Sequence, residues 1–211
     1  MKHGLFAVFG IWFLITAFPA GADPSRWAAN WPKTDFSKGS VDFAEILWGG
    51  VPKDGIPAID DPIFFPAAEF DGLADTEPVI GLVIAGDARA YPLSVLTRHE
   101  IVNDEVGGVP VAVTYCPLCN SAVVFDRRVD GRVLDFGVSG NLRNSDLVMY
   151  DRQTESWWQQ FLGEGIVGEM TGARLDAVPA RLESFARFKA RAPDGQVLNA
   201  RGYGVNPYQY Y

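Results

Sequence analysis

Two-residue turns between alternating apolar segments constrain this chain most strongly. "EIVNDEV" and "VPVAVTYC" flank Gly107-Gly108, and "SAVVFDRRV" and "RVLDFGVSG" flank Asp130-Gly131. Such dipeptides supply the positive φ angles that tight hairpin turns require. "PVIGLVIAG" also has a strand pattern, whereas "ESFARFKARAPDG" has the clearest helical spacing. The sequence therefore predicts a β-rich α+β fold: a mostly antiparallel sheet, or a partly open barrel, built from hairpins with a few short helices.

Length and composition limit the class of protein. The 211 residues suit one domain, and a hydrophobic fraction of 48% is enough for a buried core. The net charge is -8 and no cluster of Lys and Arg stands out, which argues against a nucleic-acid partner. We expect a single domain over residues 23–211, in which an irregular, proline-rich segment (23–77) packs on a β-rich core (78–211).

The first residues have the pattern of an export signal. Lys2 and His3 precede the apolar run "GLFAVFGIWFLITAFPA", and Ala20-Gly21-Ala22 fits a cleavage site for small residues. The run is shorter than the about 20 residues that a spanning helix needs. We therefore expect a signal peptide at residues 1–22 and a periplasmic or secreted protein without a stable membrane span. An uncleaved anchor is the alternative.

Cys116 and Cys119 are the only cysteines, and His99 is the only histidine after the leader. If Gly107-Gly108 forms a two-residue turn, the numbers of paired residues sum to 215, and His99 lies opposite Cys116 as a close, non-hydrogen-bonded pair. One face of this hairpin then carries Val102, Val106, Val109, Val111, Val113 and Tyr115, and the other carries His99, Asn103, Ala112, Thr114 and Cys116.

Three interpretations of the cysteines stay open. A disulfide between Cys116 and Cys119 would close a short loop and contribute about 2 kcal/mol. A thiol-disulfide redox pair would resemble Cys-x-x-Cys oxidoreductases, although a strand and not a helix is expected to follow it. A metal site would use both cysteines on a knuckle, with His99 as third ligand and Met149 as a candidate fourth. These ligands suit Zn or Cu(I), and in a catalytic centre they would suggest a metal-dependent oxidoreductase.

A polar cluster follows the second hairpin and is a candidate wall for this site. In the metal interpretation, Asn120 after the second cysteine tolerates the left-handed conformation of a knuckle. If Asp130-Gly131 forms a two-residue turn, Cys119 lies near Leu142 in register. The candidate wall consists of Asn120, Ser139, Asn141, Asn144, Ser145 and Asp146. The alternative for the cluster is a turn that caps its own backbone.

A non-enzymatic ligand-binding module is a further alternative, because 13% of the residues are aromatic. Neither a small-molecule partner nor a protein partner can be named from these patterns.

Long stretches of the chain resemble a known family. They are "GDARAYPLSVLTRHEIVNDEVGGVPVAVTYCPLCNSAVVFDR", "FGVSGNLRNSDLVMYDRQTESWW", "PKDGIPAIDDPIF" and "NPYQYY". These motifs are similar to those of the family called domain of unknown function 3179, over nearly the whole mature chain. The resemblance implies membership without a reaction. Because the motifs contain His99, Cys116 and Cys119, it implies that any shared activity centres on these residues.

The leader generates a first prediction. We expect exported material to begin at or near Asp23, because the cleavage pattern ends at Ala22. The intact mass of protein recovered from the periplasm or medium measures this, and a mass that retains residues 1–22 would support the anchor instead.

Overall fold

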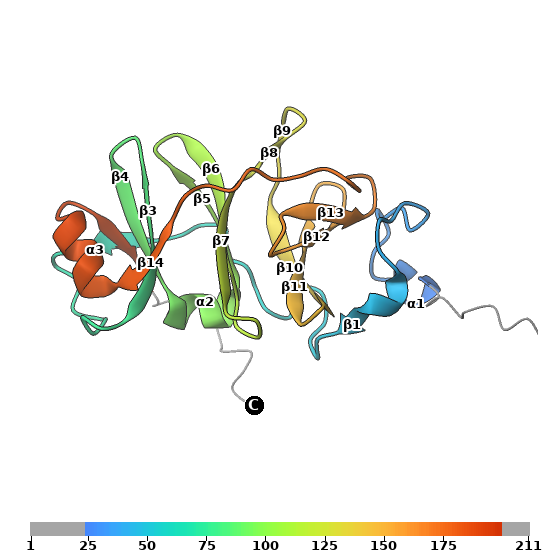
Figure 1. The fold of residues 1–211 in the computed structure, drawn as a ribbon, viewed down its shortest axis with the longest axis horizontal. Coiled ribbons are helices and arrows are strands. Elements are labelled where there is room, and N and C mark those ends of the chain that lie inside the picture. The colour runs from blue at the N-terminus through green and yellow to red at the C-terminus, as the bar shows by residue number, and fades with distance from the viewer. Residues whose placement is uncertain (1–23, 200–211) are drawn as a thin grey trace, which may run out of the picture.

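The fold is a stack of three β-sheets (Figure 1), seen in a computed structural model that describes residues 24–199; the predicted leader lies outside these residues. The central sheet has the order β5-β6-β7, the β10 sheet β1-β10-β11-β12-β13, and the β3 sheet β14-β3-β4-β15-β2. All pairs of described strands are antiparallel except β15 with β4. The predicted β-rich fold with mostly antiparallel sheets is confirmed, and among residues 24–199 no sheet closes into a barrel.

The strands are short and the helices few. The central sheet comprises β5 (Ile101–Val106), β6 (Val109–Cys116) and β7 (Ser121–Asp126). The β10 sheet comprises β1 (Ile46–Trp48), β10 (Phe136–Arg143), β11 (Asp146–Asp151), β12 (Trp157–Gln159) and β13 (Glu164–Val167). The β3 sheet comprises β2 (Phe64–Pro66), β3 (Pro78–Ile84), β4 (Asp87–Pro92), β14 (Arg181–Ser184) and β15 (Gln196–Leu198). The helices are α1 (Ser25–Ala28), the 3-10 turn η1 (Phe43–Glu45), α2 (Leu93–His99) and α3 (Phe185–Arg191).

The central sheet is buried on both faces because its side chains alternate between two cores. The register of β5 with β6 runs from Ile101↔Thr114 to Val106↔Val109, so the predicted sum of 215 is confirmed for the paired residues. One face, with Val102, Val106, Val111, Val113 and Tyr115, joins the core against the β3 sheet. The other, with Ile101, Ala112 and Cys116, joins the core against the β10 sheet.

Two neighbouring polar residues of β5 tie the central sheet to both flanking sheets. The side-chain amide of Asn103 donates to the backbone oxygen of Phe136 at 2.8 Å and accepts from its N–H at 2.9 Å, as a paired strand would. On the opposite face, Asp104 accepts hydrogen bonds from Arg89 at 2.7 Å and from the Tyr91 hydroxyl at 2.6 Å. Burial, followed by the negative charge of Asp104, raises the pKa of Tyr91 well above its usual range. Each buried polar group therefore has its partner in the adjacent sheet.

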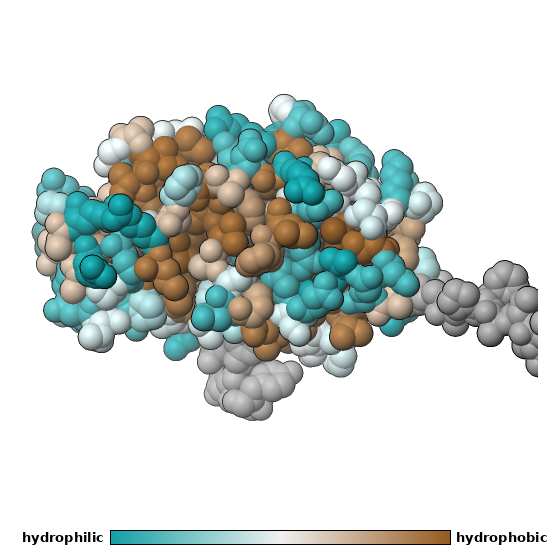
Figure 2. Space-filling view, viewed as in Figure 1, coloured by the Kyte–Doolittle hydropathy of each residue, from teal (hydrophilic) through white to brown (hydrophobic). Residues whose placement is uncertain are grey.

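The outer faces of the stack are covered by segments far apart in the sequence. Phe185 and Phe188 of α3 pack on the outer face of the β3 sheet. Trp27 and Trp31, from the N-terminal segment, pack against Trp157 on the outer face of the β10 sheet, with ring centroids 5.1 and 5.2 Å apart. The view in Figure 2 shows an apolar area over the strands from β3 to β7 and hydrophilic side chains over α3.

The second predicted hairpin forms only at its tip. Asp130 and Gly131 make the two-residue turn between β8 (Arg128–Val129) and β9 (Arg132–Val133). Beyond this ribbon, β7 continues in the central sheet and β10 in the β10 sheet, so Cys119 does not pair with Leu142. That part of the prediction is wrong, because between Asp126 and Phe136 the chain passes from the central sheet to the β10 sheet and does not fold back along β7. Among residues 24–199, no helix is long and apolar enough to cross a membrane.

The glycine turn of the β5–β6 hairpin generates a second prediction. Gly107 and Gly108 have φ angles of 55° and 80°, and a Cβ on Gly107 would lie 2.3 Å from the backbone oxygen of Ile84, whereas Gly108 has open space. Gly108→Ala should cost about 1–2 kcal/mol, the penalty of a left-handed residue. Gly107→Ala should cost roughly 1–3 kcal/mol more through the clash with β3. Urea unfolding measures both, and equal losses would contradict the close approach.

Candidate metal centre

Cys116 and Cys119 lie on the tight connection between β6 and β7. Cys116 ends β6 and pairs with Ser121 at the start of β7, so residues 117–120 form the turn. Asn120 has a φ of 51°, and its side-chain oxygen accepts a hydrogen bond of 3.0 Å from the Tyr115 hydroxyl. The predicted order of strand, knuckle and strand is therefore present, with Asn120 in the left-handed conformation. Both cysteines are free thiols in this structure.

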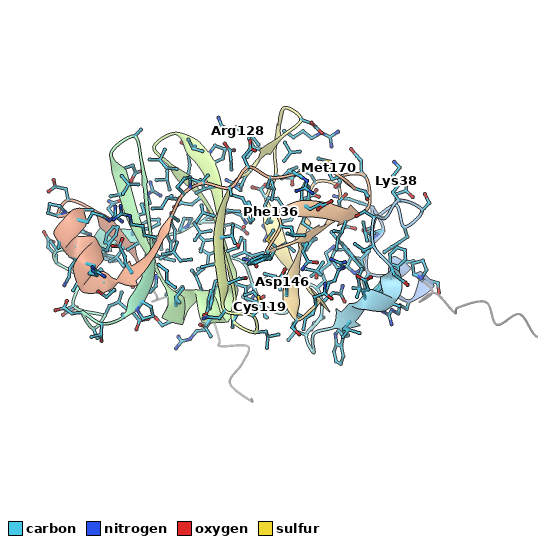
Figure 3. The ribbon with its side chains drawn as sticks, viewed as in Figure 1. Lys38, Cys119, Arg128, Phe136, Asp146 and Met170 are labelled. Carbon is cyan, nitrogen blue, oxygen red and sulfur yellow. The ribbon has the colours of Figure 1, made fainter. Side chains whose placement is uncertain are left out.

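Asp146 completes a group of three potential metal ligands. It begins β11, and its Oδ1 accepts a hydrogen bond of 3.2 Å from the Cys119 thiol (Figure 3). The sulfur atoms of Cys116 and Cys119 and a carboxylate oxygen of Asp146 all lie within 4.8 Å of one another. Among residues 24–199, no other three His, Cys, Asp or Glu side chains meet this distance. The group spans two sheets, since the cysteines belong to the central sheet and Asp146 to the β10 sheet.

The sulfur of Cys119 is surrounded by oxygen atoms. Besides Asp146, it contacts Ser121 Oγ at 3.1 Å and the Cys116 carbonyl oxygen at 4.0 Å. The Ser121 hydroxyl donates its hydrogen to Gln160 Oε1 at 2.6 Å, so it presents a lone pair to the sulfur. One thiol hydrogen is thus shared among several acceptors. Converging lone pairs of this kind favour a cation between them.

Two consecutive glutamines orient this group. Gln159 donates to Asp146 Oδ2, which also accepts from the Phe161 N–H at 3.0 Å, so that Oδ1 is left facing the sulfur. Gln160 accepts from Ser121 and donates to Thr114 Oγ1 at 2.8 Å. Both glutamine side chains are buried. Hydrogen bonds behind the ligands hold metal sites in geometry, and here each glutamine supports a different part of the group.

Cys116 is buried in the core between the central and β10 sheets. This burial raises the pKa of its thiol to about 12, and the hydrogen bond with the Cys119 side chain acts in the same direction. Backbone N–H groups of Cys119 and Leu147 point to the sulfur and lower the pKa, but by less. The thiol therefore keeps its proton at neutral pH unless a cation replaces it.

The group opens on one side into a hollow of about 270 Å³. Cys119 is exposed at its edge, whereas Asp146 is only 5% exposed. The lining consists of Cys119, Ser121, Arg143, Asn144, Asp146, Gln159, Phe161 and Leu162. A small molecule could reach the exposed sulfur from this side.

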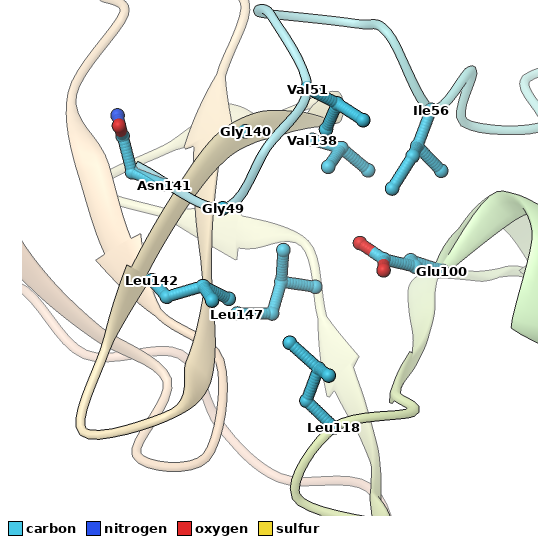
Figure 4. A pocket seen from close by; sticks show the side chains of 10 residues that line it. All are labelled: Gly49, Val51, Ile56, Glu100, Leu118, Val138, Gly140, Asn141, Leu142 and Leu147. Carbon is cyan, nitrogen blue, oxygen red and sulfur yellow. The ribbon is translucent and has the colours of Figure 1, made fainter. Parts of the chain in front are cut away.

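A second, apolar hollow of about 250 Å³ lies on the other side of the knuckle (Figure 4). Leu118, between the two cysteines, lines it together with Leu142 and Leu147 of the β10–β11 hairpin. Glu100 is the one acidic side chain in its lining, and the residue has a φ of 60° where α2 ends and β5 is about to begin. A positive φ angle is uncommon for residues other than glycine, so the chain reversal at Glu100 has an unusual backbone conformation.

His99 is not brought into the group. It is the last residue of α2, and the pairing of β5 with β6 starts only at Ile101, so the predicted cross-strand pair with Cys116 is not formed. Its Nδ1 donates a hydrogen bond of 2.8 Å to the Pro57 carbonyl oxygen, and burial lowers the pKa of the ring. The physical reason is the reversal at Glu100, which interrupts the extended backbone that the register argument assumes.

The other predicted residues divide between two places. Asn120, Asn144, Ser145 and Asp146 lie at the knuckle and the facing turn, where the Cys116 thiol lies 3.8 Å from the Ser145 carbonyl oxygen. Ser139 and Asn141 lie farther along β10, at an irregularity in its pairing, and do not line the hollow beside Cys119. Met149 is fully buried in the core and pairs with Val138 and Trp158.

Comparison with known proteins places the chain in a family without assigning a reaction. The model of the family described as "Protein of unknown function (DUF3179)" matches residues 53–211. The chain belongs to the DUF3179 family. No curated protein and no solved structure gives a significant match. The DUF3179 match includes both cysteines, Asp146 and the two glutamines, so the whole candidate centre lies inside the family's region.

Sequence reasoning named Asp146 only as part of a wall and missed both glutamines. Asp146 directly follows the Asn144-Ser145 turn, whose two residues have φ angles of 53° and 62°. Gln159-Gln160 follow two tryptophans in a segment that reads equally as strand or helix. The sequence feature that could have indicated the role of the two glutamines is their position at the end of an aromatic strand.

The unequal environments of the cysteines generate a third prediction. At pH 8, iodoacetamide should modify one cysteine per metal-free, reduced chain, because Cys119 is exposed while Cys116 is buried and keeps its proton. Mass spectrometry of peptides identifies the modified residue. Cys119→Ser should abolish the fast reaction and Cys116→Ser should retain it, and fast modification of Cys116 would contradict the buried, protonated thiol.

Proposed function

We propose that this DUF3179 protein binds a zinc ion through Cys116, Cys119 and Asp146, and that it does so as an exported protein. The observation that carries the proposal is the convergence of the two sulfurs and the Asp146 carboxylate within 4.8 Å. Two thiolates and a carboxylate are ligands that Zn²⁺ accepts. Cu(I) prefers soft ligands only, so replacing the expected histidine by a carboxylate favours zinc over copper.

The proposed centre has three protein ligands and one open side. In zinc enzymes this arrangement leaves the fourth position to water or substrate, whereas structural zinc sites use four protein ligands. The open side faces the hollow lined by Arg143, Phe161 and Leu162. Because zinc has no redox chemistry, the centre would polarise a bound group or activate water, and would not transfer electrons.

A thiol-disulfide function is the second candidate. It is favoured by the position of an exposed thiol, Cys119, beside a buried one, Cys116. Two features count against it. The segment after the cysteines is the strand β7, so no helix N-terminus stabilises a thiolate. The contacts of the Cys119 sulfur are to oxygen atoms, which suit a cation better than a nucleophile.

Metal content and affinity test the proposal. The reduced protein, freed of adventitious ions and titrated with Zn²⁺ against a chromophoric chelator, should bind one zinc per chain. Asp146→Asn and Cys119→Ser should weaken binding by more than the roughly 10–100-fold that outer hydrogen bonds contribute. Gln159→Leu should fall within that range, because it removes the donor that orients Asp146.

His99→Gln is the matched control, since it alters the nearby histidine outside the group of three. Its zinc affinity should equal that of the wild type, and thermal unfolding of each variant confirms that it is folded. Loss of zinc in His99→Gln but not in Asp146→Asn would show that the ligand set is wrong. Absence of zinc from the wild type, with a mixed disulfide trapped on Cys116 in Cys119→Ser, would favour the redox candidate.

A further inference from the structure

A third hollow, of about 440 Å³, lies between the N-terminal segment and β10. Ser139 and Asn141, which do not reach the cysteines, line this hollow instead. Its other lining residues are Arg26, Trp27, Asn30, Trp31, Trp48, Val51, Pro52 and Lys53. None of them belongs to the proposed zinc centre, so a ligand bound in this hollow would not depend on zinc.

A β-bulge presents Asn141 to this hollow. The register of β10 with β11 shifts between Val138 and Asn141, and Gly140 takes a φ of 77° there. Ser139 Oγ donates to the Val148 carbonyl and accepts from the Asn141 N–H at 3.0 Å, which holds the bulge. Bulges commonly redirect a side chain beside a functional site.

The amide of Asn141 has no hydrogen-bond partner among residues 24–199, although the residue is only 4% exposed. Figure 4 shows its amide directed away from the apolar side chains around Glu100. The amide lies at the wall of the hollow, where it offers two donors and one acceptor to a ligand. The position therefore suits a ligand with paired donor and acceptor groups.

Trp48 supplies an aromatic surface at the same hollow. Its side chain is 73% exposed, and its indole N–H donates to the Val51 carbonyl at 3.1 Å, which fixes the direction of the ring. Within the described residues, no other aromatic ring stacks on it. A large apolar ring that is held in place but uncovered is a contact surface for an apolar face of a ligand.

The cations of the lining are already engaged by the protein. Lys53 Nζ pairs with Glu155 at 2.8 Å and lies 4.4 Å from the centroid of the Trp31 ring. Arg26 donates to the Ile46 carbonyl at 3.0 Å and lies over the ring of Trp27. Glu155 neutralises Lys53, and the Arg26 guanidinium is directed to a carbonyl and a ring. The groups left for a ligand are the Trp48 ring and the Asn141 amide, which suit an uncharged ligand.

We propose that this hollow binds an uncharged pyranose sugar. The C–H face of a pyranose ring is apolar and matches Trp48, while two adjacent hydroxyls, each both donor and acceptor, match the Asn141 amide. The volume of about 440 Å³ accommodates one or two sugar rings.

Ligand-observed NMR with the purified protein tests the proposal, using maltose, cellobiose and N,N′-diacetylchitobiose as probes. At least one probe should bind. Trp48→Ala should weaken that binding at least about tenfold, because a central aromatic anchor contributes that much or more. Asn141→Ala should weaken it similarly, and Trp48→Phe should restore most of it, since a ring is again present.

Phe161→Ala is the control, since Phe161 is also an exposed aromatic (62%, against 73% for Trp48) and lies beside the cysteines, outside this hollow. It should leave sugar binding unchanged. Failure of all three probes to bind would overturn the proposal, and so would binding that persists in Trp48→Ala or that disappears in Phe161→Ala. Zinc binding by Trp48→Ala should match the wild type, so a loss of sugar binding with zinc retained separates this site from the zinc centre.

Discussion

The alternation of side chains along the β5–β6 hairpin is the constraint on which the rest of the structure depends. A strand has two faces, and both faces of this hairpin are buried, against the β3 sheet on one side and the β10 sheet on the other. A slip of one residue would exchange the two sets of side chains. It would also turn Asn103 and Asp104 away from their partners in the flanking sheets, leaving buried polar groups unpaired. The register is therefore held by apolar and polar contacts together.

The cysteine centre is a consequence of this stacking. The hairpin places Cys116 on the face that meets the β10 sheet, and the left-handed Asn120 turns the chain so that Cys119 stays near it. Asp146 belongs to the β10 sheet and lies at the tip of the β10–β11 hairpin. A site assembled across two sheets is rigid only if both are held, and Gln159 and Gln160 make hydrogen bonds to both sides of it.

The β10–β11 hairpin serves two separate hollows. Its tip carries Asp146 toward the cysteines, while its bulge carries Asn141 toward Trp48 and the N-terminal segment. Gly140 makes the bulge between these two places possible. It takes a positive φ, and a Cβ at this position would lie 2.1 Å from the Val51 carbonyl oxygen. One ribbon can therefore present different chemistry at two places along its length.

Local rules were enough to predict the turn at Gly107-Gly108, the two faces of its hairpin and the conformation of Asn120, because each depends on residues close together in the chain. They were not enough for His99, since the reversal at Glu100 and the hydrogen bond to Pro57 depend on packed neighbours. They also could not select Asp146 over the other acids. Its contact with Cys119 joins residues of two different sheets, and only the stacking of those sheets, which local sequence patterns do not encode, brings the carboxylate to the sulfur.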